Sequence, residues 1–327
     1  MAATVSVLKS CPGGYVGSGH VHPAVVDCAR RAVSDAKNEG LVDDAYVARC
    51  GDDLALVLLH EMPPRTPAVR TLAVTTFTAC SEVAWGLGQF GCPDRGNGGP
   101  KLETAELVLE EPSEPVLCLI ADKAGPGCWN AHLYRAFGDP FNTPSLLTDP
   151  RMTPGFAFEV DLHGGHRRFE LPADLHSFLA EAAGPGFVRR VSASGGGAAA
   201  ACASAGADPV LLVRCPPGLP SVGEVLESLS FPYAVAGWHS PGQAGPLMPV
   251  STNDDAATRL DGPPRAIGLG FQVSGGRLVG PRDLLGDRAF DGARAHALQA
   301  VDYLRRHGPF APGFAAAAPL PSRSLTI

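Results

Sequence analysis

Two adjacent aspartates, Asp52 and Asp53, are the sharpest chemical feature of the sequence. They lie in "GDDL" (51–54), between two apolar runs that predict β-strands. Neighbouring carboxylates repel each other unless water or a cation neutralises them. A hard cation such as Mg²⁺ prefers carboxylate oxygens. The pair is therefore either part of a metal site or a polar turn whose charges are solvated.

A further acid, Asp122, ends the apolar run "VLCLIAD" and is followed by Lys123 and a loop rich in Gly and Pro. Binding residues are common in loops that a rigid strand positions. Asp122 could contribute to a metal site, and Lys123 could meet a phosphate group as a point charge. The alternative is an ion pair on the surface.

A glycine-rich loop, "SCPGGYVGSGHVHP" (10–23), connects a predicted strand to a predicted helix. Such a loop could hold an anion at the helix N-terminus. It lacks the GxGxxG order and the Walker lysine, so nucleotide binding is not indicated. Within it, Cys11 is a candidate soft ligand or nucleophile, and His20 is a candidate ligand or proton carrier. The simpler alternative for Cys11 is a small buried residue.

The segment "RLDGPPR" (259–265) brings Arg259, Asp261 and Arg265 around a rigid Gly-Pro-Pro turn. Guanidinium groups bind phosphate in a bidentate manner, which makes these residues candidates for substrate binding. A loop anchored by salt bridges would have the same residue pattern, and the sequence leaves both interpretations open.

Composition narrows the class of protein. The chain has 327 residues, of which 45% are hydrophobic and 18% charged, as in ordinary globular proteins. A net charge of −7 without a basic stripe argues against nucleic acid as a partner. No segment approaches the roughly 18 unbroken apolar residues of a membrane span, and the N-terminus does not resemble a signal peptide. We expect a cytoplasmic protein whose nine cysteines, without a CxxC pair, are reduced.

Hydrophobic periodicity predicts the order β-α-β-β-α-β-β over the first 130 residues. Later segments predict hairpins around Gly164-Gly165 and Gly275-Gly276, with further helices and strands between them. The low-complexity segment 194–207 is expected to be a flexible loop or a short Ala-rich helix. The fold class is α/β (α+β), with two mostly antiparallel sheets and helices on the outer faces in a four-layer α/β/β/α sandwich. We expect one domain over residues 1–310 and a disordered tail over 311–327.

Taken together, the motifs resemble the bifunctional fructose-1,6-bisphosphate aldolase/phosphatase family of archaea and deep-branching bacteria. In chain order they are "HPAVV", "GDDL", "ADKAGPG", "YRAFGDPFNTP", "DPVLLVR", "GPLMPV", "TRLDGPPRAIGLGFQV", "GRLVGP" and "YLRRHGPF". The resemblance implies the same four-layer sandwich, a homo-octamer and a cluster of Mg²⁺ ions. It also implies one site that joins two triose phosphates through a lysine Schiff base and then hydrolyses the C1 phosphate. By this resemblance the metal ligands are Asp52, Asp53, Asp122 and Asp208, with Asp94 in place of a glutamine ligand.

Several positions depart from the family pattern. Where the family has a Lys-Asp-Asp triplet, this chain has Gly206, Ala207 and Asp208, so the Schiff-base lysine and one acid are missing. The other replacements are Cys11 for an aspartate, Ser18 for a ligand histidine, Ala203 for a tyrosine and Ser240 for a phosphate-binding arginine. The short tail lacks a match for a further active-site tyrosine.

These departures predict that the aldolase reaction is lost, because glycine cannot supply the nucleophilic amine. We expect an enzyme, either lyase or phosphatase-like, repurposed to another Mg²⁺-dependent reaction with fewer ions than the family uses. Its substrate would be a small polar metabolite, phosphorylated or not, of a kind used in specialised biosynthesis. Lys123 would hold an anionic group, and Cys11 and His20 would act in the pocket. Two alternatives stay open: a residual sugar-phosphate phosphatase and a non-catalytic scaffold that binds a partner.

Overall fold

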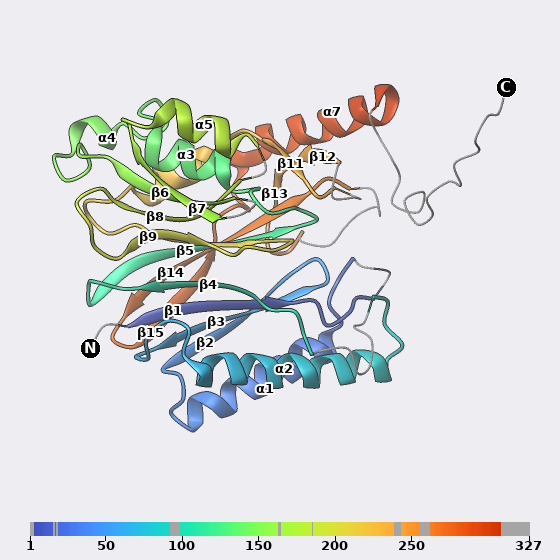
Figure 1. The fold of residues 1–327 in the computed structure, drawn as a ribbon. Coiled ribbons are helices and arrows are strands. Elements are labelled where there is room, and N and C mark those ends of the chain that lie inside the picture. The colour runs from blue at the N-terminus through green and yellow to red at the C-terminus, as the bar shows by residue number, and fades with distance from the viewer. Residues whose placement is uncertain are drawn as a thin grey trace.

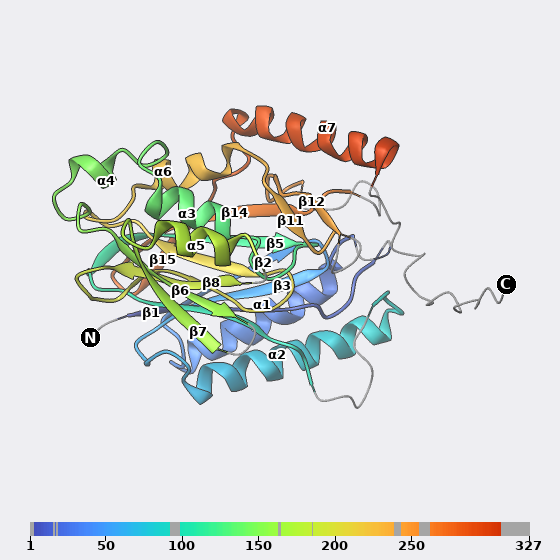
Figure 2. The same ribbon diagram turned by 45° about the horizontal axis from the view of Figure 1, so that its top comes forward.

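The computed structural model describes residues 3–15, 17, 19–91, 99–162, 165–184, 186–238, 243–254 and 262–308. The fold is mixed α/β, and the strands of the described part form a four-stranded sheet, a nine-stranded sheet and a two-stranded ribbon. Figures 1 and 2 show the two large sheets lying against each other, with helices on their outward sides. The same part of the chain has no helix long and apolar enough to cross a bilayer.

The N-terminal third forms the four-stranded antiparallel sheet, in the order β2-β3-β1-β4. Two amphipathic helices cover its outer face, and a core of apolar side chains joins them to the sheet. Each helix begins with a proline, at Pro23 and Pro67, a residue already suited to the first helical position. The bounds are β1 (Thr4–Ser10), α1 (Pro23–Asn38), β2 (Asp44–Cys50), β3 (Asp53–His60), α2 (Pro67–Gly86) and β4 (Glu103–Val108).

The nine-stranded sheet has the order β13-β14-β5-β10-β9-β8-β6-β7, with β15 paired to β14. Its pairs are antiparallel except for β13 with β14. Its strands are β5 (Ser113–Asp122), β6 (Phe156–Leu162), β7 (Gly165–Leu171), β8 (Phe187–Ala193), β9 (Ala199–Ala203), β10 (Val210–Arg214), β13 (Met248–Pro249), β14 (Arg265–Ser274) and β15 (Arg277–Asp283). The ribbon consists of β11 (Ala234–Ala236) and β12 (Ala244–Pro246).

The remaining helices lie over the outer side of this larger sheet (Figure 1). A large aromatic core beneath them includes Trp129, Phe137, Phe158 and Phe178. The helices are α3 (Asn130–Gly138), α4 (Ser145–Thr148), α5 (Leu175–Ala182), α6 (Val222–Glu227) and α7 (Asp291–His307), with 3₁₀ turns η1 (Ser228–Ser230) and η2 (Arg288–Phe290).

A third core fills the space between the two sheets. It contains Val5 and Val7 of β1, Val57 of β3, and Ile120 and Ile267 of the opposing sheet. Successive side chains of a strand point to opposite faces. Every second residue of the inner strands therefore enters this space, and this alternation decides which side chains reach its end.

The sequence predicted the fold class, the mostly antiparallel pairing and the element order of the first 130 residues, and these predictions are confirmed. The expectation for segment 194–207 was wrong. Residues 199–203 form β9, an inner strand between β8 and β10. Alanine has weak strand propensity, but five consecutive small residues fit closely between two neighbours that supply the backbone hydrogen bonds. The expected tail, residues 311–327, lies outside the described residues.

Candidate metal centre

The β2–β3 turn places the two adjacent aspartates at one end of the space between the sheets. Cys50 and Asp53 are partners across a two-residue turn of Gly51 and Asp52, and Gly51 has φ +60°. A glycine at the first turn position with positive φ is typical of tight hairpins. Asp53 is buried, whereas Asp52 is half-buried. The turn therefore aims one carboxylate inward and leaves the other at the rim.

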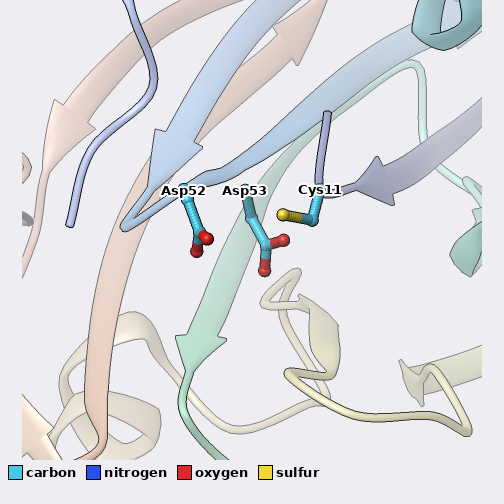
Figure 3. Close-up of side chains that lie close together, drawn as sticks. All are labelled: Cys11, Asp52 and Asp53. Carbon is cyan, nitrogen blue, oxygen red and sulfur yellow. The ribbon is translucent and has the colours of Figure 1, made fainter. Parts of the chain in front are cut away.

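Cys11 follows directly after β1 and adds a thiol to this pair. Ligand atoms of Cys11, Asp52 and Asp53 all lie within 4.8 Å of one another. Figure 3 shows the two carboxylates and the sulfur facing a common space at the ends of their strands. Burial raises the pKa of this thiol, and the charge of Asp52 contributes to the rise. The sequence-predicted residues Cys11, Asp52 and Asp53 therefore do come together.

Asp122, at the end of β5, lies against the same turn. A Cβ atom on Gly51 would come within 2.8 Å of the Asp122 carboxylate, so only glycine permits this close approach. Arg265 is the register partner of Asp122 on β14, and its guanidinium forms a buried ion pair with that carboxylate. The sequence did not predict this pair, which joins two strands and is buried. A substrate-binding role for Arg265 stays a prediction.

Asp208 precedes β10 and joins the acids from the larger sheet. Its backbone N–H donates to the Ala124 carbonyl (2.6 Å), and the Ala124 N–H donates to its Oδ1 (2.7 Å). This pair of bonds fixes Asp208 beside the loop that follows β5. Asp208 has φ +51°, which is uncommon for a residue other than glycine but tolerated by aspartate. The carboxyl group is held on the side of Asp53 and Asp122, both of which act on its pKa.

Lys9 is a further residue of the site, beyond those predicted from the sequence. Its ammonium group is buried and forms an ion pair with Asp53. Burial lowers the pKa of Lys9, but the charges of Asp53 and Asp208 outweigh burial and raise the pKa above its usual value. Lys9 is therefore a protonated counter-ion and not a neutral nucleophile.

One rule of strand geometry brings all these groups together. In each strand they continue the alternating series whose apolar members fill the core between the sheets. The series are Val5-Val7-Lys9-Cys11, Val57-Ala55-Asp53, Ile120-Asp122, Leu212-Val210-Asp208 and Ile267-Arg265. The chain thus changes from apolar to charged side chains at the same end of five strands. This pattern is the signal that could have revealed Lys9 in the sequence.

The electrostatics of the centre match a cation site. Burial, followed by the charge of Asp53, raises the pKa of Asp52 to about 6 and that of Asp208 to about 7. Burial also raises the pKa of Asp53 and, together with the nearby acids, that of Cys11. Four aspartates face two basic side chains, Lys9 and Arg265, so the centre carries excess negative charge. Oxygen ligands with uncompensated charge fit a divalent cation, and Asp52, Asp53, Asp122 and Asp208 would hold it.

The other predicted site residues are placed as follows. His20 pairs with Tyr15 through the backbone, and burial and the charges of Arg49 and Arg265 lower its pKa, so it lies on the Arg265 side of the centre. Lys123 follows Asp122 directly and has φ +59°. Asp94, Arg259 and Asp261 lie outside the described residues.

Position 206, where the resemblance places a lysine, has a different environment. The backbone N–H of Gly206 donates to the Glu103 carboxylate (2.8 Å). A Cβ atom on Gly206 would lie 1.9 Å from Oε1 of Glu103. Any side chain at position 206 therefore requires this carboxylate to move. Glu103 was not predicted from the sequence, because its hydrogen bond to Gly206 depends on contact between β4 and the β9–β10 connection.

Fold and centre together define a class: a mixed α/β protein with a cluster of aspartates at one end of the space between two sheets. The family model described as fructose-1,6-bisphosphatase matches residues 2–322. The chain is 43% identical to the fructose-1,6-bisphosphate aldolase/phosphatase of Moorella thermoacetica, over 94% of this chain and 87% of that protein. It is 41% identical to the protein of the same name from Thermococcus kodakarensis, over 94% and 91% of the two chains. The chain therefore belongs to the fructose-1,6-bisphosphate aldolase/phosphatase family, and the resemblance read from its motifs is confirmed.

Proposed function

We propose that this protein is a metal-dependent enzyme that hydrolyses a small sugar phosphate without forming a lysine Schiff base. The observation that carries the proposal is the convergence of Asp52, Asp53, Asp122 and Asp208 on one end of the space between the sheets. The names of the family and of its relatives support a phosphorylated sugar as substrate.

The four aspartates would hold one or more divalent cations, Mg²⁺ among the candidates. A bound cation of this kind supplies Lewis acidity, which withdraws charge from a phosphate ester and makes water a better nucleophile. The chain's own part is to orient and balance charge. Lys9 pairs with Asp53, Arg265 pairs with Asp122, and Lys123 would attract the anionic substrate.

Two observations support the loss of the aldol reaction. Schiff-base chemistry needs a neutral amine. Position 206 offers no amine, and the nearby Glu103 carboxylate takes the space of a side chain there. Lys9 is buried at the centre, but its raised pKa keeps it protonated.

The test is phosphate release from fructose 1,6-bisphosphate and a panel of sugar monophosphates, with Mg²⁺ or Mn²⁺ and with EDTA. We expect release that depends on the cation and stops with EDTA. Release that persists in EDTA contradicts a metal-dependent reaction. No release from any sugar phosphate, in a protein that binds the cation, contradicts hydrolysis and favours the second candidate below.

The second candidate is a different metal-dependent reaction on another small polar metabolite. Cys11 favours it, because a thiol beside Asp52 and Asp53 changes the chemistry of the centre and not merely its charge. A screen of metabolites by the change in thermal unfolding temperature, with the cation present, would distinguish it. A ligand that is not a sugar phosphate and that stabilises the chain only with the cation would support this candidate.

We also propose that copies of the chain form a homo-oligomer, as the resemblance implies. Light scattering coupled to size-exclusion chromatography tests the assembly: a mass of several times 33.8 kDa supports it, and a single-chain mass contradicts it.

We also propose the expected α/β/β/α sandwich as the arrangement of the layers. The two sheets and three cores support it.

A further inference from the structure

Cys11 distinguishes this centre from a site built of oxygen ligands alone. Among the described cysteines, it is the one that lies with acids in a group able to hold a metal ion. Cys118, by contrast, is fully buried in the core between the sheets, and the buried Cys80 thiol of α2 donates to the Val25 carbonyl of α1. The surroundings of Cys11 therefore differ from those of an ordinary buried thiol.

The geometry allows the sulfur and the carboxylates to share one ion. Typical bond lengths are about 2.3 Å to sulfur and about 2.1 Å to oxygen, so two ligands on opposite sides of an ion are at most about 4.4 Å apart. The ligand atoms of Cys11, Asp52 and Asp53 lie within 4.8 Å of one another. A shift of a few tenths of an ångström closes the difference. Two of the three residues are half-buried at the rim, where such a shift disturbs no packed core.

The alternation of β1 explains why the thiol is aimed at the centre. Val5, Val7 and Lys9 fill the space between the sheets, and Cys11 is the next residue of that series. A residue with the opposite parity would face the helices. The thiol is therefore directed at the acids by the strand, and its sulfur lies within 4.8 Å of ligand atoms of Asp52 and Asp53.

The choice of ligand selects the class of cation. Carboxylate and carbonyl oxygens suit Mg²⁺, whereas a thiolate favours softer cations such as Zn²⁺, Co²⁺ and Fe²⁺. We propose that Cys11 Sγ coordinates the cation together with Asp52 and Asp53, so that the centre binds a thiophilic divalent cation in preference to Mg²⁺. On binding, the thiol gives up its proton to solvent and the thiolate becomes the ligand. This inference rests on the proposal that the acids hold a divalent cation.

The test is titration of the full chain with Co²⁺ under a non-thiol reductant, followed by calorimetry and near-ultraviolet absorption. A cobalt–thiolate bond gives an intense charge-transfer band that oxygen ligands do not give. We expect this band in the wild-type protein, its persistence in excess Mg²⁺, and its loss on adding Zn²⁺. Loss of a group that only supports a ligand already weakens binding by about 10–100-fold, so we expect Cys11→Ser to abolish the band and weaken Co²⁺ binding by about 100-fold.

Two variants serve as controls. Cys28→Ser removes a half-buried thiol on α1 and should keep the band. Cys11→Asp should lose the band but bind Mg²⁺ more tightly than the wild type, which shows that the centre is intact. Calorimetric binding of Co²⁺ without a band, or a band that survives Cys11→Ser, overturns the role of Cys11 while the cation site stands. No binding of any divalent cation overturns both this inference and the metal-dependent function.

Discussion

Two regions of the molecule that meet at the same site differ sharply. The strand ends that carry Asp52, Asp53 and Asp122 keep a dense set of acids with Lys9 and Arg265 as built-in counter-ions. The β9–β10 connection keeps Asp208 but has Gly206 and Ala207 where the resemblance implies a lysine and a further acid. The acids that we propose as cation ligands are present, whereas position 206 has no amine.

The acids at the strand ends and position 206 are held by different parts of the structure. Asp53, Asp122 and Asp208 continue the alternating series of three strands whose apolar residues form the core between the sheets. Position 206 lies in the short connection between β9 and β10, outside the strands that carry these acids. Asp208 keeps its place through two hydrogen bonds with Ala124 that any residue's backbone could partly supply. A connection of this kind can lose one catalytic group without harm to the fold.

The largest effect should come from breaking the buried pair of Lys9 and Asp53. Removing one partner of such a pair leaves an uncompensated buried charge, which costs about 3–5 kcal/mol. We therefore expect Asp53→Asn to lower the free energy of unfolding by that amount in urea titrations. The double variant Lys9→Met/Asp53→Asn should recover at least about 1 kcal/mol relative to the sum of the single variants. Additive effects would mean that the pair contributes little coupling.

Asp52 tests function apart from stability, because it is half-buried and its main contacts are within the centre. We expect Asp52→Asn to reduce cation-dependent phosphate release by about 100-fold, or roughly 2.7 kcal/mol in transition-state energy. Asp302→Asn, on the exposed side of α7, is the matched control and should leave the rate unchanged. A full rate in Asp52→Asn would exclude this acid from the cation site.

Loss of stability at low pH can come from a residue outside the metal centre, so such residues must be tested before the loss is attributed to the aspartates. His132 of α3 is buried beside Trp129 and Tyr233, and burial lowers its pKa to about 4. Its ordinary pKa is 6.5, so the unfolded chain takes up a proton between pH 6.5 and 4 while the folded chain does not. Stability therefore falls as pH drops through this window, by about 2 kcal/mol at pH 5.

His132→Asn removes this titration and keeps a donor for the Ser228 carbonyl. Unfolding free energies at pH 7.5 and pH 5 should differ by about 2 kcal/mol less in the variant than in the wild type. An unchanged difference would show that His132 is not the source of the loss.

The smallest expected effect is the absence of a Schiff base that borohydride could trap. Borohydride treatment with dihydroxyacetone phosphate should add no mass to the intact protein, because Lys9 is protonated and Gly206 has no amine. A class I aldolase is the positive control. A trapped adduct, located by peptide mapping, would identify a lysine that performs Schiff-base chemistry after all.

The sequence was informative where strand periodicity applies and less so elsewhere. It predicted the two strands on either side of the Asp52-Asp53 turn and the strand that ends at Asp122, because apolar alternation and glycine turns are local signals. It failed at β9, where an Ala-rich stretch forms a strand only because β8 and β10 flank it. Glu103 was missed because its role comes from a contact between elements far apart in the chain. Lys9 was missed although the alternation of β1 could have revealed it, because its partner Asp53 lies on another strand.

We propose that the aspartates and their cation support phosphate hydrolysis without a Schiff-base lysine. The most direct test is ³¹P NMR of the purified protein with fructose 1,6-bisphosphate and a divalent cation. We expect the signals of inorganic phosphate and a sugar monophosphate to grow, with no triose phosphate signals at any time. Triose phosphate signals would contradict this proposal, because they would show that carbon–carbon bond cleavage survives without a lysine at position 206.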